Sequence, residues 1–213
     1  MNANRPFFFL PYFALLAILG WVLCTSEKLQ FHLWLHEFHN TFLDYVIPYC
    51  THLGDGLFVL SIALMLLLFY NQRTGILLVL GYVFSSVIAQ LLKRLVFPDY
   101  MRPFHFFKNN VDFHQIPNFL YFESNGFPSG HTTSAFAFAT VFCYLHGKKP
   151  WVQFLLFGMA VFVGFTRVYL SQHFLLDVYF GSILGVVCGW MLLRVIPKNW
   201  FPNTKPMLTR WKK

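Results

Sequence analysis

A histidine and an aspartate four residues apart, His173 and Asp177, are the side chains in this sequence best suited to nucleophilic chemistry. They stand at the start of an apolar run, and at helical spacing they lie on one face, one turn apart. A carboxylate in that place accepts one imidazole N–H, fixes the tautomer and leaves the other nitrogen free to attack. A structural histidine with an incidental acid is the alternative, which apolar surroundings disfavour because ionisable groups are costly in a membrane.

The tetrapeptide Pro128-Ser129-Gly130-His131 leads directly into another apolar run. Amides at a helix N-terminus bind anions, a glycine lets backbone approach a phosphate, and Ser129 can cap the helix or donate to a phosphate oxygen. His131 is then placed to protonate a leaving alkoxide as a general acid. An ordinary turn and N-cap would explain Ser129 and Gly130 but not the histidine.

Three cations, Lys93, Arg102 and Arg167, have no acidic residue in an obvious pairing register. Positive groups that hold the non-bridging oxygens of a phosphoryl group are expected electrostatic catalysts of its transfer. Snorkelling at a helix end is the alternative for Lys93 and its neighbour Arg94. That alternative suits Arg167 less well, because its neighbours are apolar.

The composition indicates that a membrane surrounds these residues. Of 213 residues, 57% are hydrophobic and 11% are charged, whereas soluble domains carry about 25% charged residues. The net charge of +8 comes from dispersed and terminal basic residues rather than a stripe, so we expect membrane topology and not nucleic acid to explain it. Four cysteines without a CxxC pair are expected to be small core residues.

Six apolar runs predict an all-α, polytopic protein with six transmembrane helices in one bundle, since a span needs roughly 20 residues. The first run lacks a small-x-small cleavage pattern and is predicted to be a retained span rather than a signal peptide. The fourth is rich in Thr, Ser and Ala, which favours a helix packed inside the bundle. The runs are Phe7–Cys24, Gly56–Tyr70, Gly75–Leu92, Thr132–Leu145, Trp151–Phe165 and Phe174–Leu193.

Charge supports this topology independently. If the N-terminus is inside and six helices alternate, the inner segments carry only basic residues, as expected of cytoplasmic loops. These are Arg5, Arg73, Lys148, Lys149, Arg194, Lys198, Lys205, Arg210, Lys212 and Lys213. Every acidic residue falls on the outer side or at an outer helix end: Glu27, Glu37, Asp44, Asp55, Asp99, Asp112, Glu123 and Asp177. The same alternation gathers all the candidate site residues on the outer face of a cytoplasmic membrane.

Two further stretches complete a single domain over residues 1–213. Residues 26–51 alternate apolar and polar side chains and predict an interfacial helix between the first and second spans. Residues 104–127 form the longest outer loop and are expected to cover the site. His32, His36 and His39, with Glu37, could share a helix face and bind zinc; the pattern lacks His-Glu-x-x-His, so a polar stripe is preferred and no metal is predicted.

Together these motifs resemble the type 2 phosphatidic acid phosphatase superfamily over residues 93–177. Its pattern is a Lys followed by Arg-Pro, then Pro-Ser-Gly-His, then Ser-Arg-x5-His-x3-Asp; here Thr166 replaces the usual Ser. The resemblance implies a membrane phosphatase without metal or cofactor. His173 would form a phosphohistidine, oriented by Asp177, and His131 would protonate the leaving group. The residues implied to hold phosphate are Lys93, Arg102, Ser129, Gly130 and Arg167.

The sequence departs from the family in its first motif. Eight residues separate Lys93 from Arg102, where the family usually has six, so Arg94 stays a candidate for the acting cation. A two-residue bulge through Pro98-Asp99-Tyr100 is expected to keep Lys93 in place. The implied substrate is a lipid phosphate or diphosphate: phosphatidate, phosphatidylglycerol phosphate, a polyprenyl diphosphate or a phosphorylated glycolipid of the lipid A type. A phosphotransferase and a non-catalytic transporter or lipid-binding relative are the alternatives.

Overall fold

The computed structural model describes residues 5–111, 113–197, 199–200 and 205–208, and every regular element in these ranges is a helix. The prediction of an all-α chain is thus confirmed for the described residues. Five charged positions used in the topology argument, Asp112, Lys198, Arg210, Lys212 and Lys213, lie outside them. The elements are α1 (Pro6–Thr25), α2 (Lys28–His36), α3 (Thr41–Cys50), η1 (Thr51–Gly54), α4 (Gly56–Phe69), α5 (Gln72–Leu91), η2 (Leu92–Val96), α6 (Pro103–Phe107), α7 (Gly130–His146), α8 (Pro150–Tyr169) and α9 (Leu175–Val195).

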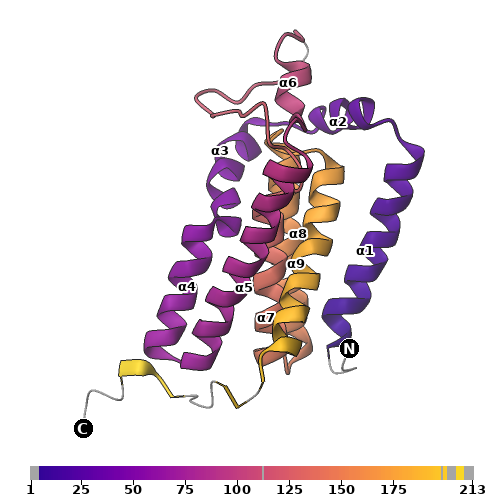
Figure 1. Cartoon of the computed structure of the whole chain (residues 1–213). Coiled ribbons are helices and arrows are strands. Elements are labelled where there is room, and N and C mark those ends of the chain that lie inside the picture. The colour runs from indigo at the N-terminus through magenta and orange to yellow at the C-terminus, as the bar shows by residue number, and fades with distance from the viewer. Residues whose placement is uncertain (1–4, 112, 198, 201–204, 209–213) are drawn as a thin grey trace.

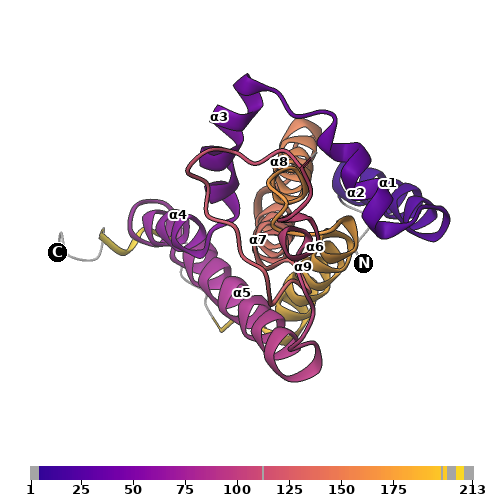
Figure 2. The same ribbon diagram turned by 90° about the horizontal axis from the view of Figure 1, so that it is seen from above.

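Helix α7 is the centre of the bundle, with α5, α8 and α9 packed around it and α1 at the outside (Figures 1 and 2). Its small residues let neighbours approach closely, as predicted for this run. Three glycines of α9, spaced four residues apart, face α7: a Cβ at Gly185 would lie 2.4 Å from the Thr133 carbonyl oxygen. Of the cysteines, Cys143 and Cys188 are buried as predicted, whereas Cys24 on α1 is exposed and is not a core residue.

Four helices in the described part of the chain are long and apolar enough to cross a membrane: α1, α5 with η2, α8 and α9. A fifth span results if residues 41–54 and 56–69, which meet at a bend of 54°, are counted as one. The run Thr132–Leu145 corresponds to α7, which has 17 residues, at the short end of the range of lengths that cross a bilayer. Length and composition therefore establish a multi-pass membrane protein with four or five candidate spans.

The segment between α1 and α4 contains two α-helices, followed by the 3-10 helix η1, rather than the one helix that was predicted. The Asn40 side chain caps α3 by accepting from the Leu43 N–H at 3.0 Å, which divides the segment. Figure 1 shows α2 lying across one end of the bundle, while α3 turns down toward α4. Helix α6 lies above the same end. These connections therefore roof the end of the bundle where α7 and α9 begin.

Candidate active site

The eight predicted site residues all lie at the roofed end of the bundle. Helices α7 and α9 begin there, and α5 with η2 and α8 end there (Figure 1). The beginnings of α1, α5 and α8 lie at the opposite end. Three separate sequence motifs are therefore brought together by antiparallel packing of neighbouring helices.

His173 and Asp177 face each other at the start of α9. The His173 Nδ1 atom lies 3.4 Å from Asp177 Oδ2, and both side chains are almost fully buried. This is an ion-pair separation rather than a well-formed hydrogen bond, and the carboxylate is held by the Phe174 N–H at 2.9 Å. Because Nδ1 points at the carboxylate, the nitrogen left for chemistry is Nε2.

A tight loop fixes His173 to the end of α8. The backbone N–H groups of Gln172 and His173 both donate to the Arg167 carbonyl, at 3.0 and 3.2 Å. Ser171 has a φ of 49°, in the left-handed region that a serine rarely adopts. Such backbone strain persists only where surrounding contacts determine it. The loop thus fixes the backbone of His173 to the last turn of α8.

His173 is surrounded by positive groups. Burial lowers the pKa of His173 well below its usual value, and the charges of Arg102, Lys93 and Arg167 act in the same direction, followed by His131. An imidazole in this setting is neutral at physiological pH and keeps a lone pair. The same charges create a strongly positive space in which an anion would be stabilised.

Ser129 and Gly130 form the N-terminus of α7. The Ser129 hydroxyl is 2.8 Å from the Thr132 hydroxyl and 3.5 Å from the Thr132 N–H, so it acts as the helix cap. The Ser129 N–H donates to the Asp177 carbonyl at 3.0 Å, which joins the starts of α7 and α9. A Cβ added at Gly130 would meet nothing within 4 Å. Packing inside the chain does not require this glycine, and the space beside it is open to a ligand.

Of the two candidate cations at the end of α5, Lys93 is buried and Arg94 is exposed. The Lys93 ammonium donates to the Asn125 carbonyl at 2.7 Å, which directs it toward the loop before Ser129. The extra residues relative to the family pattern are absorbed partly by η2, a π-helical turn closed by a 2.8 Å bond from the Phe97 N–H to the Leu92 carbonyl. The bulge expected through Pro98-Asp99-Tyr100 thus begins earlier, within the helix.

The two arginines are held by neutral groups. Arg102 donates to the Ser124 carbonyl at 2.7 Å and to Gln172 Oε1 at 2.9 Å. Arg167 donates from Nη1 to the Thr51 hydroxyl at 2.7 Å, and its buried Nε has no hydrogen-bond partner among the described residues. Within that part of the chain neither arginine, nor Lys93, forms an ion pair with a carboxylate. Lys93 and Arg167 are buried, and buried charges without counter-ions are expected where an anionic ligand binds.

Several supporting residues were missed by the sequence analysis. Thr51 positions Arg167, and Gln172 positions Arg102. Lys28 donates to the Tyr100 hydroxyl at 3.1 Å and lies 4.0 Å from the centre of the Phe174 ring. Burial raises the pKa of Tyr100, and the neighbouring Asp177 carboxylate raises it further. None of these residues belongs to a recognisable motif; only the tertiary structure brings them to the site.

The histidine face considered for zinc is divided by the structure. His32 and His36 both point at the Ser171 hydroxyl, with Nε2–Oγ distances of 2.9 and 2.6 Å. His39 instead contacts Asp44. His32 and His36 therefore support the loop that carries His173, and the three histidines do not converge on one point.

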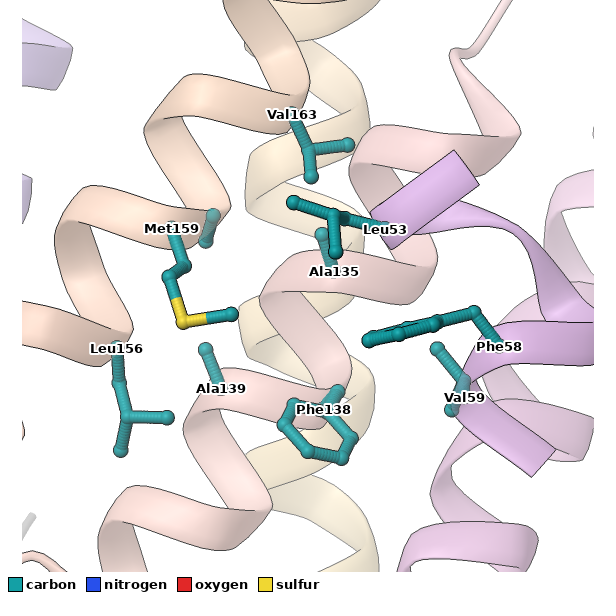
Figure 3. Close-up of a pocket in the computed structure, with 10 residues that line it drawn as sticks. Leu53, Phe58, Val59, Ala135, Phe138, Ala139, Leu156, Met159 and Val163 are labelled. Atoms are coloured by element: carbon teal, nitrogen blue, oxygen red, sulfur yellow. The ribbon is translucent and has the colours of Figure 1, made fainter. Parts of the chain in front are cut away.

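Two apolar cavities border this end of the bundle. One, of about 510 Å³, lies between α1, α2, α8 and α9, and its wall includes Val168, Leu175 and Val178, close in sequence to Arg167 and Asp177. The other, shown in Figure 3, lies between α7, α8 and the η1–α4 bend and measures about 30 Å³. Its size matches a single water molecule. Only the first has room for an apolar chain.

Comparison with known proteins adds family relationships to this geometry. A model of the PAP2 superfamily matches residues 74–201. The chain is 34% identical over 125 residues to lipid A 1-phosphatase of Rhizobium etli, covering 58% of this chain and 50% of that protein. It is 29% identical to phosphatidylglycerophosphatase B of Bacillus subtilis, covering 70% and 73%. The crystal structure of Aquifex aeolicus LpxE superimposes with a TM-score of 0.66 at 26% identity, covering 79% of this chain and 96% of that one. The chain thus spans about half the length of the rhizobial relative.

Proposed function

Since the chain belongs to the PAP2 superfamily, we propose that it is a multi-pass membrane enzyme that hydrolyses a lipid phosphate monoester or diphosphate through a phosphohistidine. The observation that carries the proposal is the arrangement around His173: a buried neutral imidazole, a carboxylate behind its Nδ1, and three cations that have no acidic partner among the described residues. These parts supply a nucleophile for a phosphoryl group and positive charge to stabilise its transfer.

In the first step, His173 Nε2 attacks phosphorus, the P–N bond forms and the P–O bond to the lipid breaks. The imidazole keeps its Nδ1 proton and becomes positively charged, which the facing Asp177 carboxylate stabilises. His131, whose protonated form the bound phosphate anion stabilises, gives its proton to the departing alkoxide. Lys93, Arg102 and Arg167 hold the non-bridging oxygens, with the free Arg167 Nε and the open space at Gly130 as contact points.

In the second step, water attacks phosphorus and the P–N bond breaks. His131, neutral after the first step, accepts a proton from that water, so the enzyme returns to its starting state and inorganic phosphate leaves. No metal is needed, because the three cations and the α7 N-terminus stabilise the developing negative charge. A lipid hydroxyl in place of water would give the phosphotransferase reaction instead.

The substrate class is a phosphorylated membrane lipid. The cavity of about 510 Å³ between α1, α2, α8 and α9 is lined by apolar side chains, so an acyl or prenyl chain can pass from the bilayer into it without leaving apolar surroundings. The named functions of the relatives, a lipid A 1-phosphatase and a phosphatidylglycerophosphatase, agree with this class.

We further infer six spans with the site on the outer face of a cytoplasmic membrane. The second span would be α3, η1 and α4 across their bend, the fourth would be α7, and α2 would lie in the interface. Basic residues support this orientation: Arg73, Lys148, Lys149 and Arg194 stand at the ends of helices away from the site. With six spans, the beginning of α1 and the end of α9 both lie on the cytoplasmic side.

Purified protein should release inorganic phosphate from a panel of phosphatidate, phosphatidylglycerol phosphate, undecaprenyl diphosphate and lipid A in detergent containing EDTA. Release from at least one substrate that continues in chelator supports the proposal, and the panel identifies the head group. Phosphate that appears only on an added lipid acceptor would make the enzyme a phosphotransferase. Binding without turnover of any substrate would overturn the proposal in favour of a non-catalytic lipid-binding protein.

A further inference from the structure

Two histidines and an aspartate form a compact cluster apart from His173. His39 Nδ1 lies 3.0 Å from Asp44 Oδ1, and His114 Nε2 lies 2.8 Å from Asp44 Oδ2. One potential ligand atom from each residue lies within 4.8 Å of the others. The residues come from the α2–α3 connection, the first turn of α3 and the loop after α6. We propose that His39, Asp44 and His114 bind a zinc ion at the roofed end of the bundle.

The donor set and its spacing suit zinc. Two imidazole nitrogens and one carboxylate oxygen, with a fourth position for water, form a common tetrahedral site with ligands at about 2.0–2.2 Å. That geometry separates ligand atoms by about 3.3 Å. The two imidazole nitrogens contact different oxygens of Asp44, and one ligand atom from each residue lies within 4.8 Å of the others, so the side chains must draw closer around an ion. The absence of sulfur ligands disfavours copper(I). The single carboxylate disfavours calcium, which prefers several oxygen ligands.

Tyr169 orients two of the three ligands. Its hydroxyl donates to Asp44 Oδ1 at 2.7 Å, and its ring stacks on His39 with centroids 4.1 Å apart. The His39 imidazole also forms a hydrogen bond with the Tyr169 backbone. Metal-binding histidines usually donate their second ring N–H to such a partner, which fixes the tautomer and leaves the other nitrogen as the ligand. The supporting contacts expected of a metal site are thus present.

The cluster is closed on one side and open on the other. The His39 and Asp44 side chains are 5% and 13% exposed, whereas the His114 side chain is 44% exposed. An ion would therefore approach from the His114 side and retain water at its open position. By joining the α2–α3 connection, α3 and the loop after α6, zinc would hold together the segments that cover the site. The alternative is a hydrogen-bonded network that needs no ion.

The test measures bound metal in the purified full-length protein and does not depend on phosphatase turnover. After treatment with EDTA and its removal, Zn²⁺ is titrated by calorimetry, and the metal content is measured after gel filtration. Co²⁺ serves as a spectroscopic probe of tetrahedral coordination. The variants are H114A, which removes an exposed ligand, and Y169F, which removes the hydroxyl on Asp44. The matched control is H105A, because His105 is 40% exposed and also pairs with a single carboxylate, that of Glu123.

We expect one zinc per chain in the wild type and in H105A, with an intense visible Co²⁺ spectrum. H114A should lose this binding, and Y169F should bind roughly 10- to 100-fold more weakly while keeping the spectrum. Wild-type protein that retains no zinc, or H114A that binds it as tightly as H105A, would overturn the proposal and leave a hydrogen-bonded network. Because turnover is not the readout, either result can be told apart from failure of the proposed phosphatase activity.

Discussion

Substituting Asp177 by asparagine tests the account of the nucleophile most sharply. Asparagine has nearly the same shape and keeps an oxygen for the Phe174 N–H, now bonded at 2.9 Å to the carboxylate. It removes the negative charge 3.4 Å from His173 Nδ1. The fold should therefore survive, while the charge that stabilises the phosphorylated imidazole is lost.

The magnitude follows from that separation. Two unit charges 3.4 Å apart interact by about 5 kcal/mol at an effective dielectric constant of about 20. Each 1.4 kcal/mol corresponds to about tenfold in rate, so D177N should lower kcat by roughly 10³- to 10⁴-fold. Because Asp177 does not touch the substrate in this account, KM should change little.

Steady-state phosphate release, measured alongside thermal unfolding in the same detergent, distinguishes this loss from misfolding. D99N is the matched control: Asp99 is an exposed carboxylate in the turn before Arg102, and its variant should retain wild-type turnover. A folded D177N that keeps more than about a tenth of wild-type kcat would refute the reasoning, because the carboxylate would then contribute little to the chemical step.

Three further predictions address the cation, the pH dependence and the topology. K93A should lose about 10²- to 10³-fold in kcat, the usual effect of removing one electrostatic stabiliser, whereas R94A should stay near wild type because Arg94 is exposed; equal losses would contradict the assignment. Because burial lowers the pKa of His173, the nucleophile stays neutral as the pH falls through 6.5, and the acid limb of kcat/KM due to His173 should lie below that pH; a loss centred near 6.5 that coincides with protonation of the His173 imidazole followed by NMR would refute this. In a cysteine-free background, a cysteine at Leu120 should react with an impermeant maleimide added to intact cells and one at Lys148 only after lysis; the reverse pattern would invert the topology.

The sequence predicts those site residues that belong to local motifs, and it does not predict those that only tertiary contacts bring to the site. His131, His173 and Asp177 belong to short local patterns at helix starts, so their spacing predicts their roles and helix packing needs only to bring them together. Lys93 could be distinguished from Arg94 only by the structure, because a π-helical turn changes which side chain faces the site. Thr51 and Gln172 hold the arginines through hydrogen bonds between segments that are distant in sequence, and such contacts leave no pattern in the sequence.

The span count and the roof were the less predictable parts of the fold. The second apolar run forms only a 14-residue helix, and a break at Asp55 with a 54° bend separates it from the residues that extend it. The segment before it contains two helices because Asn40 caps the second. A hydropathy pattern carries no information about such caps and bends. It also does not predict that His39 contacts Asp44 while His32 and His36 contact Ser171.

The central claim is that His173 carries the phosphoryl group. Protein incubated briefly with a ³²P-labelled lipid phosphate that it hydrolyses, quenched in alkali and analysed by mass spectrometry, should contain a phosphoryl group on His173 that is stable in base and lost in acid. The H173A variant should lack both this species and turnover. No phosphoenzyme under conditions of rapid turnover, or a labelled and active H173A protein, would contradict the account.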